Sequence, residues 1–176
     1  YLFARAVGSL GTMATGFYAV YGSERWGIGG DGIAILTAIL VGSQAVMNVV
    51  WGLIGDRHGH KAVLAAGSAA VALAAGVAVL AASSAWLWLV FALLGTSVAA
   101  TSVSSLNIVL EFCDAEDRPT YIGLSNTLLA PVAIAAPLLG GGLATLGGYH
   151  SLFAASALGA LLGTALMAVW VREPRG

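Results

Sequence analysis

The sequence predicts an all-α membrane protein of six transmembrane helices, on the basis of its composition, its hydropathy and the placement of its basic residues. Of its 176 residues, 59% are hydrophobic and only 9% are charged, and the mean hydropathy is +0.93. A soluble domain has roughly 25% charged residues. The composition therefore argues against a soluble protein, and the formal net charge of -1 indicates no basic surface for nucleic acid.

Six stretches are long and apolar enough to cross a bilayer, whose hydrocarbon core requires about 20 residues of helix. We predict helices at about 2–22, 33–55, 62–82, 86–110, 120–146 and 149–171. These stretches are apolar on every face instead of alternating in polarity, which favours helices over the strands of a β-barrel. The connectors are too short to hold another domain, so residues 1–176 are predicted to form a single bundle.

The six predicted helices fall into two groups of three. Helices 33–55 and 62–82 recur as 120–146 and 149–171 at the same separation. Two groups that start on opposite faces of the membrane form an inverted-topology repeat, which many transporter folds contain. We therefore expect a 3+3 inverted repeat.

The basic residues predict the orientation in the membrane. When the connectors are assigned alternately to the two faces, one face holds only Arg25. The other face holds Arg5, Arg57, Lys61, Arg118, Arg172 and Arg175. Lys and Arg concentrate in short cytoplasmic loops. We therefore expect a multi-pass protein of the plasma (inner) membrane with both termini in the cytoplasm.

The most specific motif lies between the second and third predicted helices, where the sequence from Gly52 reads G-L-I-G-D-R-H-G-H-K. This stretch resembles the loop signature of the major facilitator superfamily, G-x-x-x-D-R-x-G-R-R/K. The matching residues are Gly52, Asp56, Arg57, Gly59 and Lys61. His60 stands where the superfamily usually has Arg, which removes one cationic contact but leaves the loop basic.

The motif residues also suit a tight connector on physical grounds. Gly59 permits the positive φ that such a turn requires. Gly52 allows another helix to approach closely, and Asp56 suits a position beside the positive N-terminus of a helix. These three positions therefore predict a loop that contacts a neighbouring helix.

The charges of this loop are candidates for a conformational latch. Arg57 or Lys61 is placed to pair with Glu111, which ends the fourth predicted helix on the same face. The resemblance implies that the charge set stabilises the outward-facing state by bridging two halves of a transporter, with Asp56 meeting a helix of the other half. The alternative is that these charges only determine the topology.

Polar side chains within the predicted helices indicate a transport pathway or a seam between halves, because such groups are costly in lipid. In the second helix, Thr37, Gln44, Asn48 and Gly52 share one face. The resemblance implies that the first helix of each group lines the cavity and the second contacts the other half. The candidates are Thr12, Tyr18, Gln44, Asn48, Ser97, Thr101, Ser105 and Asn126. For the hydroxyl groups, the alternative is hydrogen bonding within or between helices.

Helix 120–146 contains two prolines, Pro131 and Pro137, which each remove a backbone donor and are predicted to kink it. The stretch Ala136-Pro137-Leu-Leu-Gly140-Gly141 resembles the G-P-x-x-G-G element of antiporter members of the superfamily. A bent gating helix is one interpretation, and an ordinary proline-kinked membrane helix is the other.

We expect neither catalytic residues, nor a metal, nor a cofactor. Cys113 is the only cysteine, and the three histidines lack the spacing of metal ligands. Ser125 and His150, the nearest approach to a serine–histidine pair, lie at opposite ends of one predicted helix, about 37 Å apart at about 1.5 Å per residue. All eight acidic residues lie in or beside connectors, so the predicted pathway wall suits a neutral or amphipathic substrate.

The resemblance spans all six predicted helices. It implies secondary active transport of a small molecule by alternating access, with this chain as one half of a twelve-helix transporter in the lipid bilayer and the other half as its partner. We expect the C-terminal half, because the chain lacks a natural start and ends in a short tail. The alternatives are a stand-alone six-helix channel and a small transporter that dimerises.

Overall fold

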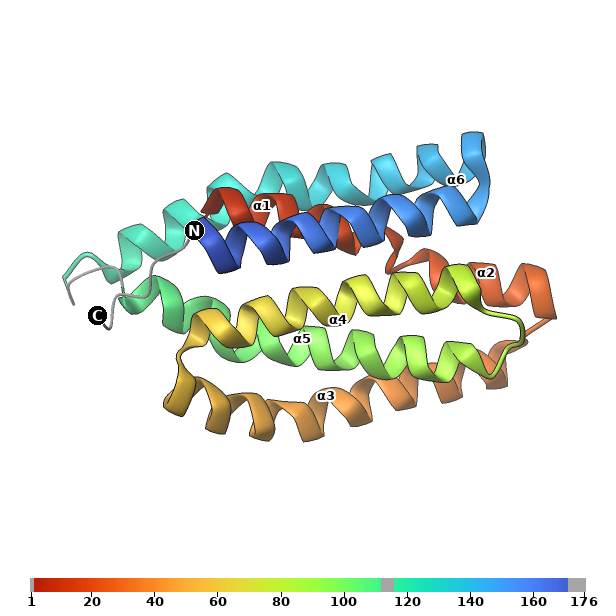
Figure 1. Ribbon diagram of the computed structural model, residues 1–176, viewed down its shortest axis with the longest axis horizontal. Coiled ribbons are helices and arrows are strands. Elements are labelled where there is room, and N and C mark those ends of the chain that lie inside the picture. The colour runs from red at the N-terminus through yellow and green to blue at the C-terminus, as the bar shows by residue number, and fades with distance from the viewer. Residues whose placement is uncertain (1, 112–115, 171–176) are drawn as a thin grey trace.

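The computed structural model describes residues 2–111 and 116–170, and in these ranges every regular element is a helix (Figure 1). In chain order the elements are α1 (Leu2–Leu10), the 3-10 helix η1 (Gly11–Ala14), α2 (Phe17–Trp26), α3 (Gly30–His58), α4 (His60–Leu80), α5 (Trp86–Glu111) and α6 (Arg118–Trp170). The predicted all-α class is confirmed.

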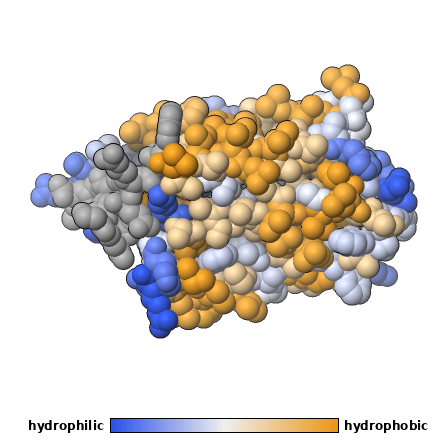
Figure 2. All heavy atoms as spheres, viewed as in Figure 1, coloured by the Kyte–Doolittle hydropathy of each residue, from blue (hydrophilic) through white to orange (hydrophobic). Residues whose placement is uncertain are grey.

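Four helices are long and apolar enough to cross a membrane. The candidate spans are Gly30–His58, His60–Leu80, Trp86–Ser105 and Arg118–Val169. The observed ends of α3, α4 and α5 differ from the predicted ends by at most three residues. Figure 2 shows apolar side chains over the middle of the visible face and hydrophilic side chains towards its ends, as expected for a membrane protein.

The structure divides the first predicted span, 2–22, into α1, η1 and α2, and α2 extends to Trp26. The division has a tertiary cause. The carbonyl oxygen of Gly11 accepts a hydrogen bond from the Ser156 hydroxyl of α6, in a segment already weakened as a helix by its glycines. The segment ends at Gly27, whose φ of 65° and backbone N–H bonds to the last turn form a glycine cap.

The two last predicted spans, 120–146 and 149–171, form one element, α6, which is interrupted at Gly148. Gly148 has φ 73° and ψ 172°, and Figure 1 shows that the chain reverses its direction at this end of the molecule. The backbone stays helical at Pro131 and Pro137, so the abrupt change of direction belongs to the glycine. The predicted proline kinks stay a prediction.

The helices pack through small residues and one aromatic cluster. α4 lies between α5 and α6, α3 packs mainly against α5, and α1 packs against α6. Gly67 of α4 faces Ala100 of α5 so closely that an added Cβ would lie 2.6 Å from the Ala100 Cβ. In the core, Phe153 is fully buried and stacks on Tyr18 at 4.8 Å between ring centroids. Small residues permit the close helix contacts that membrane bundles rely on.

Candidate functional site

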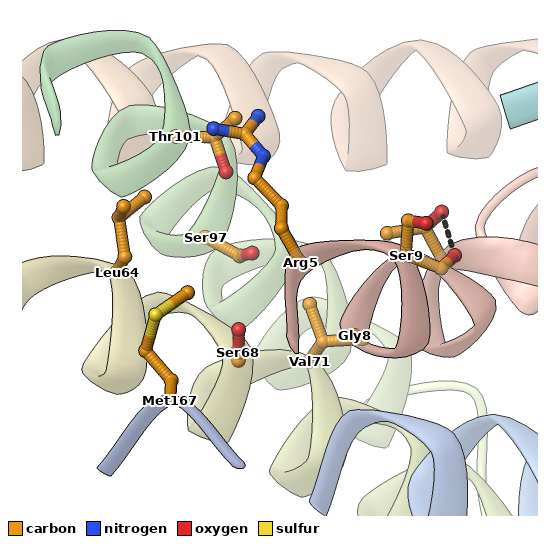
Figure 3. A pocket seen from close by; sticks show the side chains of 10 residues that line it. Arg5, Gly8, Ser9, Leu64, Ser68, Val71, Ser97, Thr101 and Met167 are labelled. Atoms are coloured by element: carbon orange, nitrogen blue, oxygen red, sulfur yellow. Dashed lines mark hydrogen bonds between the residues drawn. The ribbon is translucent and has the colours of Figure 1, made fainter. Parts of the chain in front are cut away.

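A pocket of about 130 Å³ lies where α1, α4, α5 and α6 meet. Its wall consists of Arg5, Gly8, Ser9, Thr12, Leu64, Ser68, Val71, Ser97, Thr101 and Met167 (Figure 3). The side chain of Arg5 extends from α1 towards Thr101 on α5. The pocket therefore combines one guanidinium group with several hydroxyl groups.

Helical periodicity explains why these residues share the pocket. Arg5, Ser9 and Thr12 follow one another at i, i+4 and i+7, which is one face of the N-terminal segment. Ser97 and Thr101 are four residues apart and share a face of α5. Each element therefore contributes a single polar face to the same hollow.

The pocket lies well inside the apolar part of the bundle. Its α4 residues run from Leu64 to Val71, and α4 begins at His60. At about 1.5 Å per residue these positions are about 6 to 17 Å from the start of the helix. The pocket thus extends from near one membrane face towards the middle of the bilayer.

The hydroxyl groups of the pocket differ in their hydrogen bonds. Ser9 donates to the carbonyl oxygen of Ala6 at 2.8 Å, and Thr12 donates to the carbonyl oxygen of Ser9 at 2.7 Å. Among the described residues, no hydrogen-bond partner faces the other three hydroxyls, which belong to Ser68, Ser97 and Thr101. These three groups can donate to a ligand, whereas Ser9 and Thr12 can only accept from one.

The loop between α3 and α4 is built around a buried histidine. Gly59 has φ 87°, which confirms the predicted positive φ. His60 is only 6% exposed, and its Nδ1 shares a hydrogen bond of 3.1 Å with the Ser104 hydroxyl of α5. An added Cβ at Gly55 would lie 2.8 Å from the same nitrogen, so only glycine leaves room for the imidazole.

The charged residues of this loop have different surroundings. Lys61 donates from Nζ to the carbonyl oxygen of Ala168 at 3.1 Å, in the last turn of α6. This contact satisfies a carbonyl that the helix end leaves unpaired. Asp56 and Arg57 are exposed. The side chain of Glu111 lies outside the described residues, so its predicted pairing with Arg57 or Lys61 stays a prediction.

The loop and the bundle it joins agree with one protein family across the whole sequence. The family model of the Major Facilitator Superfamily matches residues 1–176. The chain belongs to the major facilitator superfamily. No curated protein matches the sequence. Membership makes the chain a multi-pass membrane transport protein that moves a small molecule, and it is not an enzyme.

Only part of the predicted pathway meets at the pocket of this superfamily member. Thr12, Ser97 and Thr101 line it. Tyr18 instead lies in the aromatic core and is 1% exposed. Asn126 is exposed on α6.

Three further predicted residues lie on or near α3. Gln44 and Asn48 are half-buried on α3, and Ser105 is half-buried on α5. The Oδ1 of Asn48 is buried without a hydrogen-bond partner among the described residues. An unpaired buried acceptor costs free energy, so this oxygen marks a place where the bundle is incomplete.

The superfamily member holds α3 against α5 by two contacts. Trp51 donates from Nε1 to the carbonyl oxygen of Thr96 at 2.9 Å. An added Cβ at Gly95 would overlap the carbonyl oxygen of Leu40, so glycine lets the two helices approach closely. The opposite face of α3 packs against nothing in the bundle, and only 6% of its apolar span is buried.

Sequence reasoning missed two pocket residues, Arg5 and Ser68. Arg5 was assigned only to the topology, and Ser68 was regarded as a single polar residue on an otherwise apolar helix. The spacing of Arg5 with Ser9 and Thr12 was available as a signal. No group of three His, Cys, Asp or Glu residues that could hold a metal ion occurs within residues 2–111 and 116–170.

Proposed function

We propose that this chain forms one half of a twelve-helix secondary transporter that moves a small molecule by alternating access. The observation that carries the proposal is the unpacked face of α3. This helix is the least buried of the long helices, and it also bears Gln44, the unpaired Asn48 and the motif loop. A second half packed on this face would cover the polar groups and supply a partner for the Asn48 Oδ1.

We propose that the chain crosses the plasma (inner) membrane six times as a 3+3 inverted repeat with both termini in the cytoplasm. The reversal at Gly148 supports two crossings within α6, and the line of α1, η1 and α2 supports one broken crossing. The bond between Lys61 and Ala168 supports a common face for the motif loop and the end of α6. Positive residues gather on that face. The assignment as the C-terminal half stays a prediction.

Asp56 and Arg57 are the residues best placed for a latch between halves. Both are exposed at the end of α3, and Gly52 is half-buried one turn earlier on the same helix. Lys61 is already bonded to α6, which makes it an anchor of the loop within its own half. In this proposal Asp56 and Arg57 make the contact that stabilises the outward-facing state.

An accessibility experiment tests alternating access without knowledge of the substrate. The full-length protein carries Cys113→Ser and a single reporter, Thr101→Cys, and a membrane-impermeant thiol reagent is applied from the cytoplasmic side. Asp56→Asn is expected to increase the labelling rate, by about tenfold for each 1.4 kcal/mol that the latch contributes. Asp31→Asn, the same change at the other end of α3, is the matched control.

Equal labelling in the parent, Asp56→Asn and Asp31→Asn proteins would exclude the latch. Labelling that does not depend on the side of addition in any of them would favour a channel. A second copy of the chain is the other possible cover for α3. A molecular mass in detergent equal to two copies, with no further hydrophobic spans in the polypeptide, would favour the dimerising transporter.

A further inference from the structure

The inference concerns the pocket that Arg5 lines, and it rests on the proposed transport function because it names the class of substrate. A guanidinium group keeps its charge at all physiological pH values, and placing it at the level of the apolar spans is costly. The wall of the pocket contains no Asp or Glu among the described residues. The pocket is therefore a positively charged hollow inside an apolar bundle.

The other polar groups of the wall complement a negative charge. Ser68, Ser97 and Thr101 come from two helices, α4 and α5, and each has a hydroxyl proton free for a ligand within the described part of the chain. Arg5 approaches the same hollow from α1 and extends towards Thr101 (Figure 3). Four hydrogen-bond donors therefore converge from three helices.

We propose that this pocket is an oxyanion subsite, in which Arg5 binds the carboxylate or phosphate group of the transported molecule. The planar guanidinium donates two parallel hydrogen bonds to either group, and the hydroxyls of Ser68, Ser97 and Thr101 donate to the remaining oxygens. The neutral wall that the sequence predicts applies to the acidic residues only, because Arg5 makes this part of the wall cationic.

The size of the pocket limits what it holds. A volume of about 130 Å³ is small beside the roughly 300–1,000 Å³ of sites that enclose a drug-sized ligand. The pocket therefore accommodates the anionic end of a molecule, and the rest of that molecule lies outside it. Ser9 and Thr12, which donate to their own helix, line the pocket as acceptors.

The test measures binding, so it does not depend on transport. The purified full-length protein is heated in detergent, unfolding is followed by tryptophan fluorescence, and sodium phosphate or sodium acetate is titrated against sodium chloride at equal ionic strength. At least one oxyanion is expected to raise the Tm saturably. A response to phosphate assigns a phosphate group, a response to acetate assigns a carboxylate, and a response to both assigns an oxyanion of either kind.

Variants locate the effect. Arg5→Gln is expected to weaken the apparent affinity by roughly 100-fold, with a smaller loss in Arg5→Lys. Thr101→Val, which preserves shape, and Ser68→Ala are each expected to weaken it by about tenfold. Arg25→Gln removes a cation outside the pocket wall and is expected to change nothing.

Two results would overturn the proposal. One is a wild-type Tm that responds to neither oxyanion beyond chloride. The other is a response that persists in Arg5→Gln or, if that variant fails to fold, persists at wild-type affinity in both Thr101→Val and Ser68→Ala. Asp56→Asn separates the two proposals, because it is expected to retain oxyanion affinity. Saturable binding together with failure of the accessibility test would reject alternating access and leave the subsite in place.

Discussion

The contact between α1 and α6 permits a prediction in which two opposing effects can be separated. Gly163 of α6 lies against Gly8 of α1, and an added Cβ at Gly163 would overlap the Gly8 Cα and lie 2.7 Å from its N. Both groups belong to the backbone, so neither can rotate away. Gly163→Ala therefore forces the two helices apart, at a cost of about 1–3 kcal/mol for overpacking.

The same substitution also gains helix propensity, which is worth about 1 kcal/mol. Gly76→Ala in α4 isolates this gain, because an added Cβ there has no neighbour within 4 Å. The difference in free energy of unfolding between the two variants is then the steric cost alone, about 1–3 kcal/mol. At about 2–4 °C per kcal/mol for a chain of this size, Gly163→Ala is expected to melt about 2–12 °C below Gly76→Ala.

The assay is thermal unfolding of the purified protein in detergent, followed by tryptophan fluorescence. Gly8→Ala is a second control from the opposite side of the same contact. An added Cβ at Gly8 meets the Gly163 Cα at 3.6 Å and the Ser68 Oγ at 3.7 Å, which are ordinary distances, so this variant is expected to keep its stability. Equal melting temperatures for Gly163→Ala and Gly76→Ala would refute the close approach of α1 and α6.

Three further variants test other contacts by the same measurement. Phe153→Ala empties the centre of the aromatic core and is expected to cost about 3–5 kcal/mol, whereas Leu146→Ala, at a side chain that is 92% exposed, is expected to cost less than about 0.5 kcal/mol; similar losses would contradict the core assignment. Trp51→Phe removes the donor that joins α3 to α5 and is expected to cost about 1 kcal/mol, and an unchanged Tm would remove that bond. Lys61→Met is expected to lower stability by about 0.5–1.5 kcal/mol, whereas Arg57→Met leaves it unchanged; equal effects would place Lys61 at the surface with Arg57.

The long helices were predictable because local signals mark both their interiors and their ends. α3 is an uncharged apolar stretch between Asp31 and Asp56, and Gly59 follows it as a turn residue. Bilayer thickness determines the length that such a stretch must have. The positive φ of Gly59 was predictable for a similar reason, since a tight connector between two spans allows few backbone conformations.

The division of the first span was not predictable from local sequence. It depends on the hydrogen bond between Ser156 and the carbonyl of Gly11, two residues that lie at opposite ends of the chain. Periodicity describes one helix at a time and carries no information about such a partner. Tyr18 illustrates the same limit, because its ring is near a polar stripe in sequence but stacks on Phe153 in the core.

The pocket was only half predictable for a related reason. The hydroxyls of Thr12, Ser97 and Thr101 could be selected as polar groups on helix faces, but their common hollow requires the packing of four elements. Arg5 was assigned to the cytoplasmic face by charge counting, which identifies the nearest membrane face and not the direction of the side chain. His60 shows the converse case, because a residue at a motif position normally occupied by Arg is buried against Ser104.

The motif loop and the pocket are joined by a short path of contacts. Lys61 bonds to the carbonyl of Ala168, and the next residue along α6, Met167, lines the pocket. Leu64, one turn after Lys61 on α4, lines it as well. A movement of the loop that displaces Lys61 therefore shifts two walls of the pocket, whereas the exposed Asp56 can part from another half without disturbing either wall. Lys61→Met is accordingly expected to alter oxyanion affinity, and unchanged affinity in that variant would exclude this path as a route of coupling.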